Sequence, residues 1–156
     1  QPTGLFTAAT SAVTTAANTV VTYDELLDLI HSVDLAYRKH PSAGFMFSDS
    51  TFKSLRKLKD SNGNPLWVPG LANGEAGTLM GYKFSVNNDA PAFAPTAKAA
   101  VFGKLSGYTV RQAGPIYLKR LDERYADQDS IGFVAFARYD GNLIEANSVK
   151  ALTIKV

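Results

Sequence analysis

The hydrophobic pattern of this 156-residue chain changes its period once, near Pro91. Before that residue, apolar side chains recur mainly at the three- and four-residue spacing of helices, whereas after it they fall in short alternating runs. Helices followed by a series of strands are typical of an α+β domain in which helices cover a sheet. The length suits one domain, or one domain with a small subdomain.

The clearest single element is a helix that begins at Tyr23 and is predicted to continue to His40, where Pro41 stops it. Thr22 and Glu25 form a capping-box pattern, in which each side chain bonds the backbone amide of the other residue. The apolar face of this helix consists of Leu26, Leu29, Ile30, Val33, Ala36 and Tyr37.

A buried strand is predicted at 44–47, and a second helix follows it with Ser48 or Asp49 as its cap. Phe52, Leu55 and Leu58 face inward on that helix. The stretch 55–91 then reads as a surface loop around the single tryptophan, Trp67, before a strand at 81–86.

Five further strands are predicted at 98–102, 108–112, 116–121, 131–138 and 149–156. The strands at 116–121 and 131–138 are long enough to pair as an antiparallel ribbon, with the polar segment 122–130 as its tip. Residues 1–22 are rich in β-branched threonine and valine, which favours an extended arm that contains a strand.

Reaction chemistry is not visible in the sequence. The two histidines, His31 and His40, are nine residues apart and share no metal-binding turn. The segment 60–64 begins like a calcium loop, but Pro65 stands where an EF-hand loop has its glycine and Leu71 stands where its bidentate Glu is required, so we interpret it as a turn. There is no cysteine, and the net charge of +2 is spread without a basic block of the kind nucleic-acid binders carry.

The ribbon tip combines both signs of charge. Four carboxylates, from Asp122, Glu123, Asp127 and Asp129, interleave with Arg120 and Arg124. This pattern favours a salt-bridged loop or an interface patch over acid–base catalysis. Tyr125 and Arg138 belong to a Tyr/Arg-rich set that protein–protein interfaces favour, although ordinary sheet packing explains the same composition.

Several segments, in this order and spacing, resemble the C-terminal half of tailed-bacteriophage major capsid proteins with the HK97-type fold. They are Gln1-Pro2-Thr3-Gly4, Phe45-Met46-Phe47-Ser48, 77–84, Val101-Phe102-Gly103-Lys104, with Lys104 in place of the family's Asp, and Phe136-Ala137-Arg138-Tyr139-Asp140-Gly141. The resemblance implies an α+β fold with an A domain, a central sheet flanked by helices, and the β-ribbon part of a P domain. Its expected boundaries are an arm at 1–22, the A domain at 23–106, the ribbon at 107–139 and a return to the A domain at 140–156.

The function implied by the resemblance is that of a structural subunit of an icosahedral double-stranded DNA phage head, built from hexamers and pentamers. An encapsulin-like shell protein and an enzyme of unknown class are the alternatives. The implied partners are other copies of the chain, scaffolding and portal proteins, and packaged DNA without sequence specificity. The implied location is the virion, after assembly in the bacterial cytoplasm.

No catalytic activity, cofactor, metal or membrane contact is implied. The expected subunit-interface residues are Trp67, Arg120, Arg124, Tyr125, Asp127 and Arg138. Some family members cross-link through a Lys–Asn bond promoted by a Glu, but Asp129-Ser130 and Phe136-Ala137 stand where the Asn and Glu are expected. We therefore predict no self-cross-linking.

Overall fold

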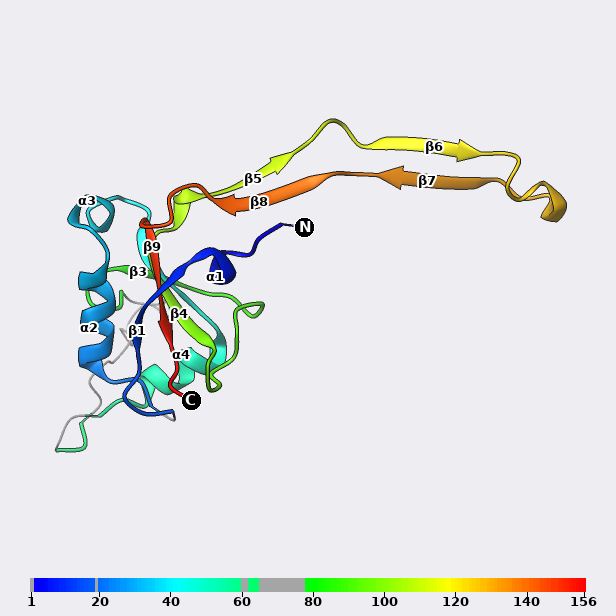
Figure 1. Ribbon diagram of the computed structural model, residues 1–156. Helices are drawn as coiled ribbons and strands as arrows, with labels where there is room; N and C mark the ends of the chain where they lie inside the picture. The colour runs from blue at the N-terminus through cyan, green and yellow to red at the C-terminus, as the bar shows by residue number, and fades with distance from the viewer. Residues whose placement is uncertain (1, 19, 60–61, 65–77) are drawn as a thin grey trace.

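The structure is a computed structural model and describes residues 2–18, 20–59, 62–64 and 78–156. Its core is a five-stranded sheet from which a long two-stranded ribbon projects (Figure 1). Across the sheet the strands are, in order, β1 (Thr10–Thr14), β9 (Val149–Thr153), β4 (Lys98–Lys104), β2 (Ala43–Phe47) and β3 (Lys83–Val86). The pairs β1–β9 and β2–β3 are parallel, and the central pairs β9–β4 and β4–β2 are antiparallel.

The main core lies between one face of the sheet and two helices, α2 (Tyr23–Ser32) and α4 (Asp49–Arg56). Leu26, Leu29 and Leu55 of these helices pack with Phe45 and Phe102 of the sheet, and all five side chains are buried. Burial of one such side chain contributes about 1.5–3 kcal/mol, so this cluster is the main source of the core's stability.

The other face of the sheet is covered by the short helix α1 (Leu5–Ala8) and by the base of the ribbon. Val101, Val149 and Ala151 form this second cluster with Ala9 and Leu143. Because both faces of β4 are covered, its five inner residues are all buried.

Gly103 lets β4 and β9 come close together at the end of the sheet. Its φ of 144° lies in the region that favours glycine, and a Cβ built there would stand 2.1 Å from the backbone oxygen of Ser148. Lys104 donates its amide to that same oxygen at 2.9 Å. Any side chain at position 103 therefore displaces backbone and not only a neighbouring side chain.

The first predicted helix is shorter in the structure. Helix α2 ends at Ser32, Val33 is extended, and a separate helix α3 (Leu35–Arg38) follows. The break has a local cause, because the carboxylate of Asp34 accepts from the amide of Ala36 at 2.8 Å and caps α3. The predicted capping box of Thr22 and Glu25 is confirmed. Ser48 is the N-cap of α4, but its hydroxyl contacts Ser50 and Thr51 and no helix amide.

The ribbon consists of two short sheets joined end to end. β5 (Tyr108–Gln112) pairs with β8 (Tyr139–Leu143), and β6 (Tyr117–Leu121) pairs with β7 (Gly132–Phe136). The 3-10 helix η1 (Leu105–Gly107) precedes the ribbon, and η2 (Ala126–Gln128) lies in its tip. The predicted run 131–138 is thus interrupted, and the pairing of the return strand extends to Leu143.

Candidate assembly interface

The ribbon has no hydrophobic core of its own. Residues that oppose each other in an antiparallel pair share one face, so the register places Leu118, Arg120, Phe133 and Ala135 on one side. Tyr117, Lys119, Leu121, Val134 and Phe136 lie on the other side. We call these the Leu118 face and the Tyr117 face. Both carry large apolar side chains.

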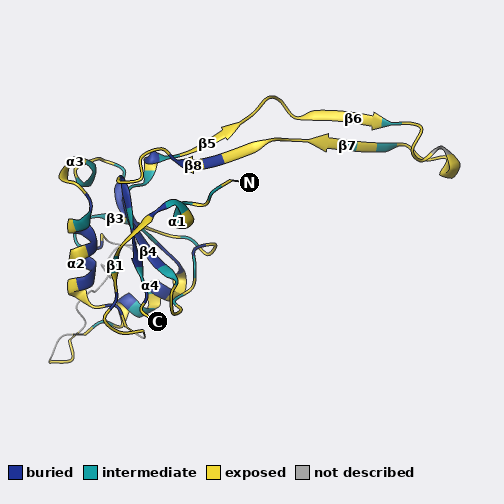
Figure 2. Cartoon of the chain, in the orientation of Figure 1, coloured by how far each residue is buried: buried dark blue, intermediate teal, exposed yellow. Residues whose placement is uncertain are grey.

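These side chains are open to solvent. Leu118 is 69% exposed and Phe133 is 64% exposed, and Figure 2 shows the ribbon almost wholly exposed beside the buried sheet strands. The other large apolar side chains exposed on the ribbon are Val110, Ile116, Tyr117, Ile131, Phe136 and Tyr139. Large apolar side chains gathered in this number on an exposed surface indicate an interaction site.

The tip, residues 122–130, is held in shape by local contacts. The ring of Tyr125 lies over Gly132, where a Cβ would come within 2.6 Å of the ring. The guanidinium of Arg124 lies 5.9 Å from the centre of the Tyr125 ring, and the carbonyl of Tyr125 accepts from Gln128 and Ser130. Arg120 and Asp122 form an ion pair at 2.5 Å, with both side chains more than half exposed. In water such a pair contributes little to stability.

A bend separates the two parts of the ribbon. Four residues, 113–116, lie opposite two, 137–138, and Gly114 takes up the difference with a φ of 80°. The amide of Ala113 still donates to the carbonyl of Arg138 at 2.9 Å. A surface pocket of about 420 Å³ lies here, lined by Ala113, Gly114, Pro115, Tyr117, Phe136 and Arg138.

The structure brings four of the expected interface residues together. Arg120, Arg124, Tyr125 and Asp127 all lie at the outer end of the ribbon, whereas Arg138 lies at the bend. Trp67 lies outside the described residues. The expected salt-bridged character of the tip is represented by the Arg120–Asp122 pair.

Leu118, Phe133 and Phe136 were not among the expected interface residues. A signal for them was present, because apolar residues stand at consecutive positions in both predicted ribbon strands. Such runs are apolar on both faces, and a ribbon of two strands has no second layer to cover either face. Tyrosine and charged residues match the average composition of interfaces, but composition does not contain this geometry.

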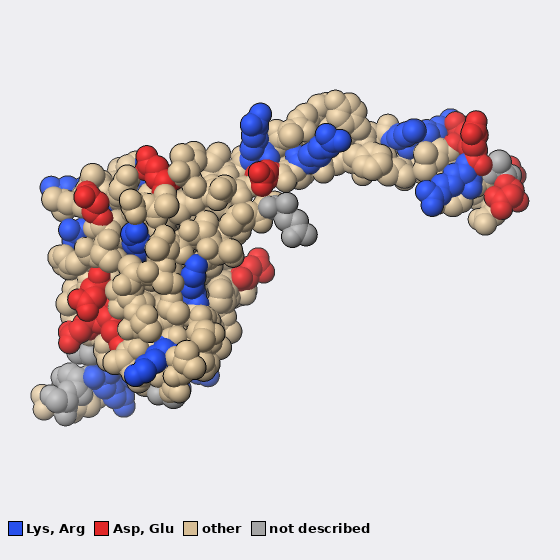
Figure 3. All heavy atoms as spheres, viewed as in Figure 1, with Lys and Arg blue, Asp and Glu red and all other residues tan. Residues whose placement is uncertain are grey.

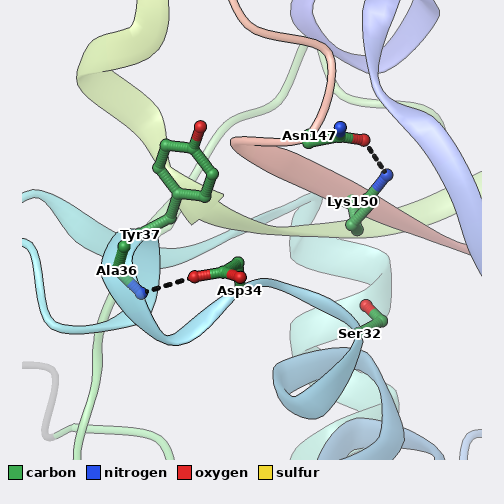
Figure 4. A pocket seen from close by; sticks show the side chains of 6 residues that line it. All are labelled: Ser32, Asp34, Ala36, Tyr37, Asn147 and Lys150. Atoms are coloured by element: carbon green, nitrogen blue, oxygen red, sulfur yellow. Dashed lines mark hydrogen bonds between the residues drawn. The ribbon is translucent and has the colours of Figure 1, made fainter.

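A surface pocket beside α3 gives no support to an enzyme. Its volume is about 560 Å³, and it is lined by Ser32, Asp34, Ala36, Tyr37, Asn147 and Lys150 (Figure 4). The Asp34 carboxylate caps α3, and the Lys150 ammonium donates to the Asn147 side chain at 2.9 Å. The carboxylate of Glu145 raises the pKa of Tyr37 above its ordinary value, so the phenol is neutral at physiological pH and is not a base.

The histidines lie outside this pocket and apart from each other. His31 bonds Arg38 through Nδ1 at 3.0 Å, and His40 bonds the Ser42 hydroxyl at 2.7 Å. Among the described residues, no group of three or more His, Asp or Glu side chains is placed to hold a metal ion. None of the helices in the described segments has the length and hydrophobicity that a transmembrane segment requires.

The phage capsid family model matches residues 1–154, nearly the whole chain. The chain belongs to the phage capsid family. This confirms the resemblance found in the sequence, and the α+β fold of the capsid chain is that of solved phage capsids with the HK97-like architecture. No match was found among the curated proteins.

Two solved capsids are similar over the full chain. The capsid of an empty GTA particle is 28% identical with a TM-score of 0.80, covering 100% of this chain and 57% of that chain. The capsid of the native GTA particle is 27% identical with a TM-score of 0.81, covering 99% and 56%. The chain from Gordonia phage Cozz is 15% identical with a TM-score of 0.65, covering 96% and 50%, and that likeness shows the fold alone. The chain thus spans about half the length of these proteins.

Proposed function

We propose that this chain is a structural subunit of the icosahedral head of a double-stranded DNA phage, where it assembles into hexamers and pentamers. Family membership and the likeness to GTA capsids support a phage head over an encapsulin-like shell. The observation that carries the proposal is the projecting ribbon, whose outer strands β6 and β7 carry large apolar side chains on both faces and have no layer to cover either.

The energetics of the ribbon favour association with further copies. Burial of a side chain such as Leu118 or Phe133 contributes about 1.5–3 kcal/mol. Association costs about 4–15 kcal/mol in lost rotational and translational freedom, so several such side chains must be covered at once. A ring of identical subunits provides this through heterologous contacts, in which one patch meets a different patch on the neighbour.

The proposed division of the chain follows the capsid analogy. Residues 23–106 and 144–156 constitute the A domain and residues 1–22 an arm whose strand β1 pairs with β9. The ribbon of the P domain is residues 107–143, beyond the expected end at 139, because β8 pairs with β5 as far as Leu143. Trp67, which lies outside the described residues, is assigned to a subunit contact by the same analogy. Arg120, Arg124, Tyr125, Asp127 and Arg138 contact neighbouring subunits, and no catalytic role is assigned to any residue.

The proposed setting is the virion, with assembly in the bacterial cytoplasm together with scaffolding and portal proteins. Packaged DNA contacts the inner surface without sequence specificity, which agrees with a net charge of only +2.

The test uses the full chain encoded by the gene, examined by sedimentation and electron microscopy. We expect closed particles from the unmodified chain and none from a variant with Leu118→Ser and Phe133→Ser. Both substitutions lie at exposed positions, so the variant should melt at the same temperature as the parent.

The matched control carries Val20→Ser and Leu35→Ser, which also remove exposed apolar side chains but on the core. It should form particles like the parent. The proposed function is contradicted if the parent chain forms no closed particles when scaffolding and portal proteins are supplied.

A further inference from the structure

The ribbon is electrically polar along its length. Its tip, residues 122–130, carries four carboxylates against one guanidinium, a net charge of −3. Its shaft, which we define as residues 108–121 and 131–143, carries four cations against one carboxylate, a net charge of +3. Figure 3 shows Lys and Arg side chains spaced along the ribbon, with Asp and Glu side chains gathered at its far end.

Local pairing removes only a small part of this polarity. Within the ribbon, whose charged side chains the structure all describes, Arg120–Asp122 is the one ion pair within 4.0 Å. Glu123, Asp127 and Asp129 remain at the tip, opposed only by Arg124, whose guanidinium lies over Tyr125. The shaft cations that remain are Arg111, Lys119 and Arg138, and all three are exposed.

The tip is too far from the inner shaft of its own chain to neutralise it. Strand β7 separates Gly132 from Phe136, a span of about 13 Å at about 3.3 Å per residue, and Arg138 lies beyond it. The screening length at physiological ionic strength is about 8 Å, so the carboxylates of the tip interact weakly with Arg111 and Arg138 of the same ribbon. Asp140 stands opposite Arg111, but its carboxylate accepts from the Gly141 amide at 2.9 Å and forms no ion pair with Arg111 within 4.0 Å. The remaining charges of the tip and of the inner shaft are therefore available to another molecule.

We infer that the acidic tip of one ribbon contacts the basic shaft of a second copy of this chain. The inference rests on the proposed function and specifies the geometry of one subunit contact. The two surfaces have opposite and equal net charge, and apolar side chains such as Leu118 and Phe133 lie along the shaft where the tip would dock. The contact is heterologous, since the tip of one ribbon meets the shaft of another. Two acidic tips repel each other, which disfavours contact of tip with tip.

Charge reversal tests this geometry in the full chain. The shaft variant carries Arg111→Glu and Arg138→Glu, and the tip variant carries Glu123→Lys and Asp127→Lys. In each variant the net charges of tip and shaft have the same sign, so the two surfaces repel. We therefore expect particle yield to fall by about tenfold or more. The variant with all four substitutions has opposite signs again and the net charge of the parent, so its yield should return to near the parent level.

A core control separates this contact from a general effect of charge. Lys39→Glu and Lys53→Glu make the same change in net charge as the shaft variant, at exposed positions away from the ribbon, and should leave the yield unchanged. Thermal melting of every variant establishes that it is folded. The inference is overturned if the shaft variant or the tip variant assembles like the parent. It is also overturned if the variant with all four substitutions is folded but assembles no better than the shaft variant and the tip variant. In either case the parent still forms particles, and the proposed function stands.

Discussion

At the scale of single residues, Glu25 connects the N-terminal segment to the first helix of the core. Its carboxylate accepts from the amide of Ala16 at 2.6 Å and from the amide of Thr22 at 2.7 Å, and its side chain is buried. The capping box predicted from the sequence therefore has a second role, because the same carboxylate holds the chain just after β1.

Replacement of Glu25 by Ala should lower the free energy of unfolding by about 1–2 kcal/mol, because the cap and the contact with Ala16 are lost together. Asp24, exposed in the same helical turn, is the matched control. Its replacement by Ala removes only an interaction with the helix dipole, at a cost of about 0.5 kcal/mol. Denaturant unfolding measures both variants, and equal losses would contradict the second role.

Gly103 provides a residue-scale test of close packing between strands. Replacement by Ala adds a Cβ 2.1 Å from the Ser148 oxygen at a φ of 144°, and we expect a loss of about 3 kcal/mol from strain and overpacking together. Gly81 is the control, since its φ of 82° is also positive but nothing lies within 4 Å of the added Cβ. There Ala should cost only about 1–2 kcal/mol. Similar melting temperatures for the two variants would show that β4 and β9 can move apart freely.

At the scale of elements, the ribbon and the sheet differ in what stabilises them. Strand β4 has a neighbour on each side and is covered on both faces, whereas the outer ribbon strands β6 and β7 each have one neighbour and no covering layer on either face. A two-stranded ribbon by itself is marginally stable in water.

Ribbon amides of the unassembled subunit should therefore exchange with solvent about a hundredfold or more faster than those of β4 and β9. Hydrogen exchange followed by mass spectrometry resolves the segments 108–121 and 131–143 from the core. In assembled particles the same amides should become protected. Equal protection of ribbon and β4 before assembly would mean that the ribbon unfolds only together with the core.

At the scale of the whole molecule, the buried core that stabilises the fold and the projecting ribbon are formed by different parts of the chain. The two buried clusters contain no residue from 109–142. Tyr108 and Leu143, which flank this segment, stand directly opposite each other.

A variant in which Asn-Gly replaces residues 109–142 should fold, because this pair forms the tight turn that joins two opposed strand residues. Its core should melt close to the temperature of the parent, although the bond from Thr3 to Gly141 is lost. It should form no particles. Loss of cooperative melting would contradict the independence of the core, and particles from this variant would contradict the role of the ribbon.

The sequence by itself determined the local elements and their order. The cap at Thr22, the apolar stripes of α2 and α4 and the alternating strands were all readable, since each depends on residues within a few positions of one another. The break at Val33 and Asp34 was missed, because the stripe continues in register across it and only the Asp34 bond to Ala36 ends the helix.

Tertiary structure decided which apolar residues are buried. Phe102 and Phe133 both lie in predicted strands with consecutive apolar residues, yet one is fully buried in the sheet and the other is 64% exposed on the ribbon. The difference depends on whether another layer covers the strand, and that layer comes from residues distant in the sequence. For the outer ribbon strands β6 and β7 no such layer exists within the described chain. Their consecutive apolar residues are visible in the sequence, but the missing layer that leaves them exposed is a property of the tertiary structure.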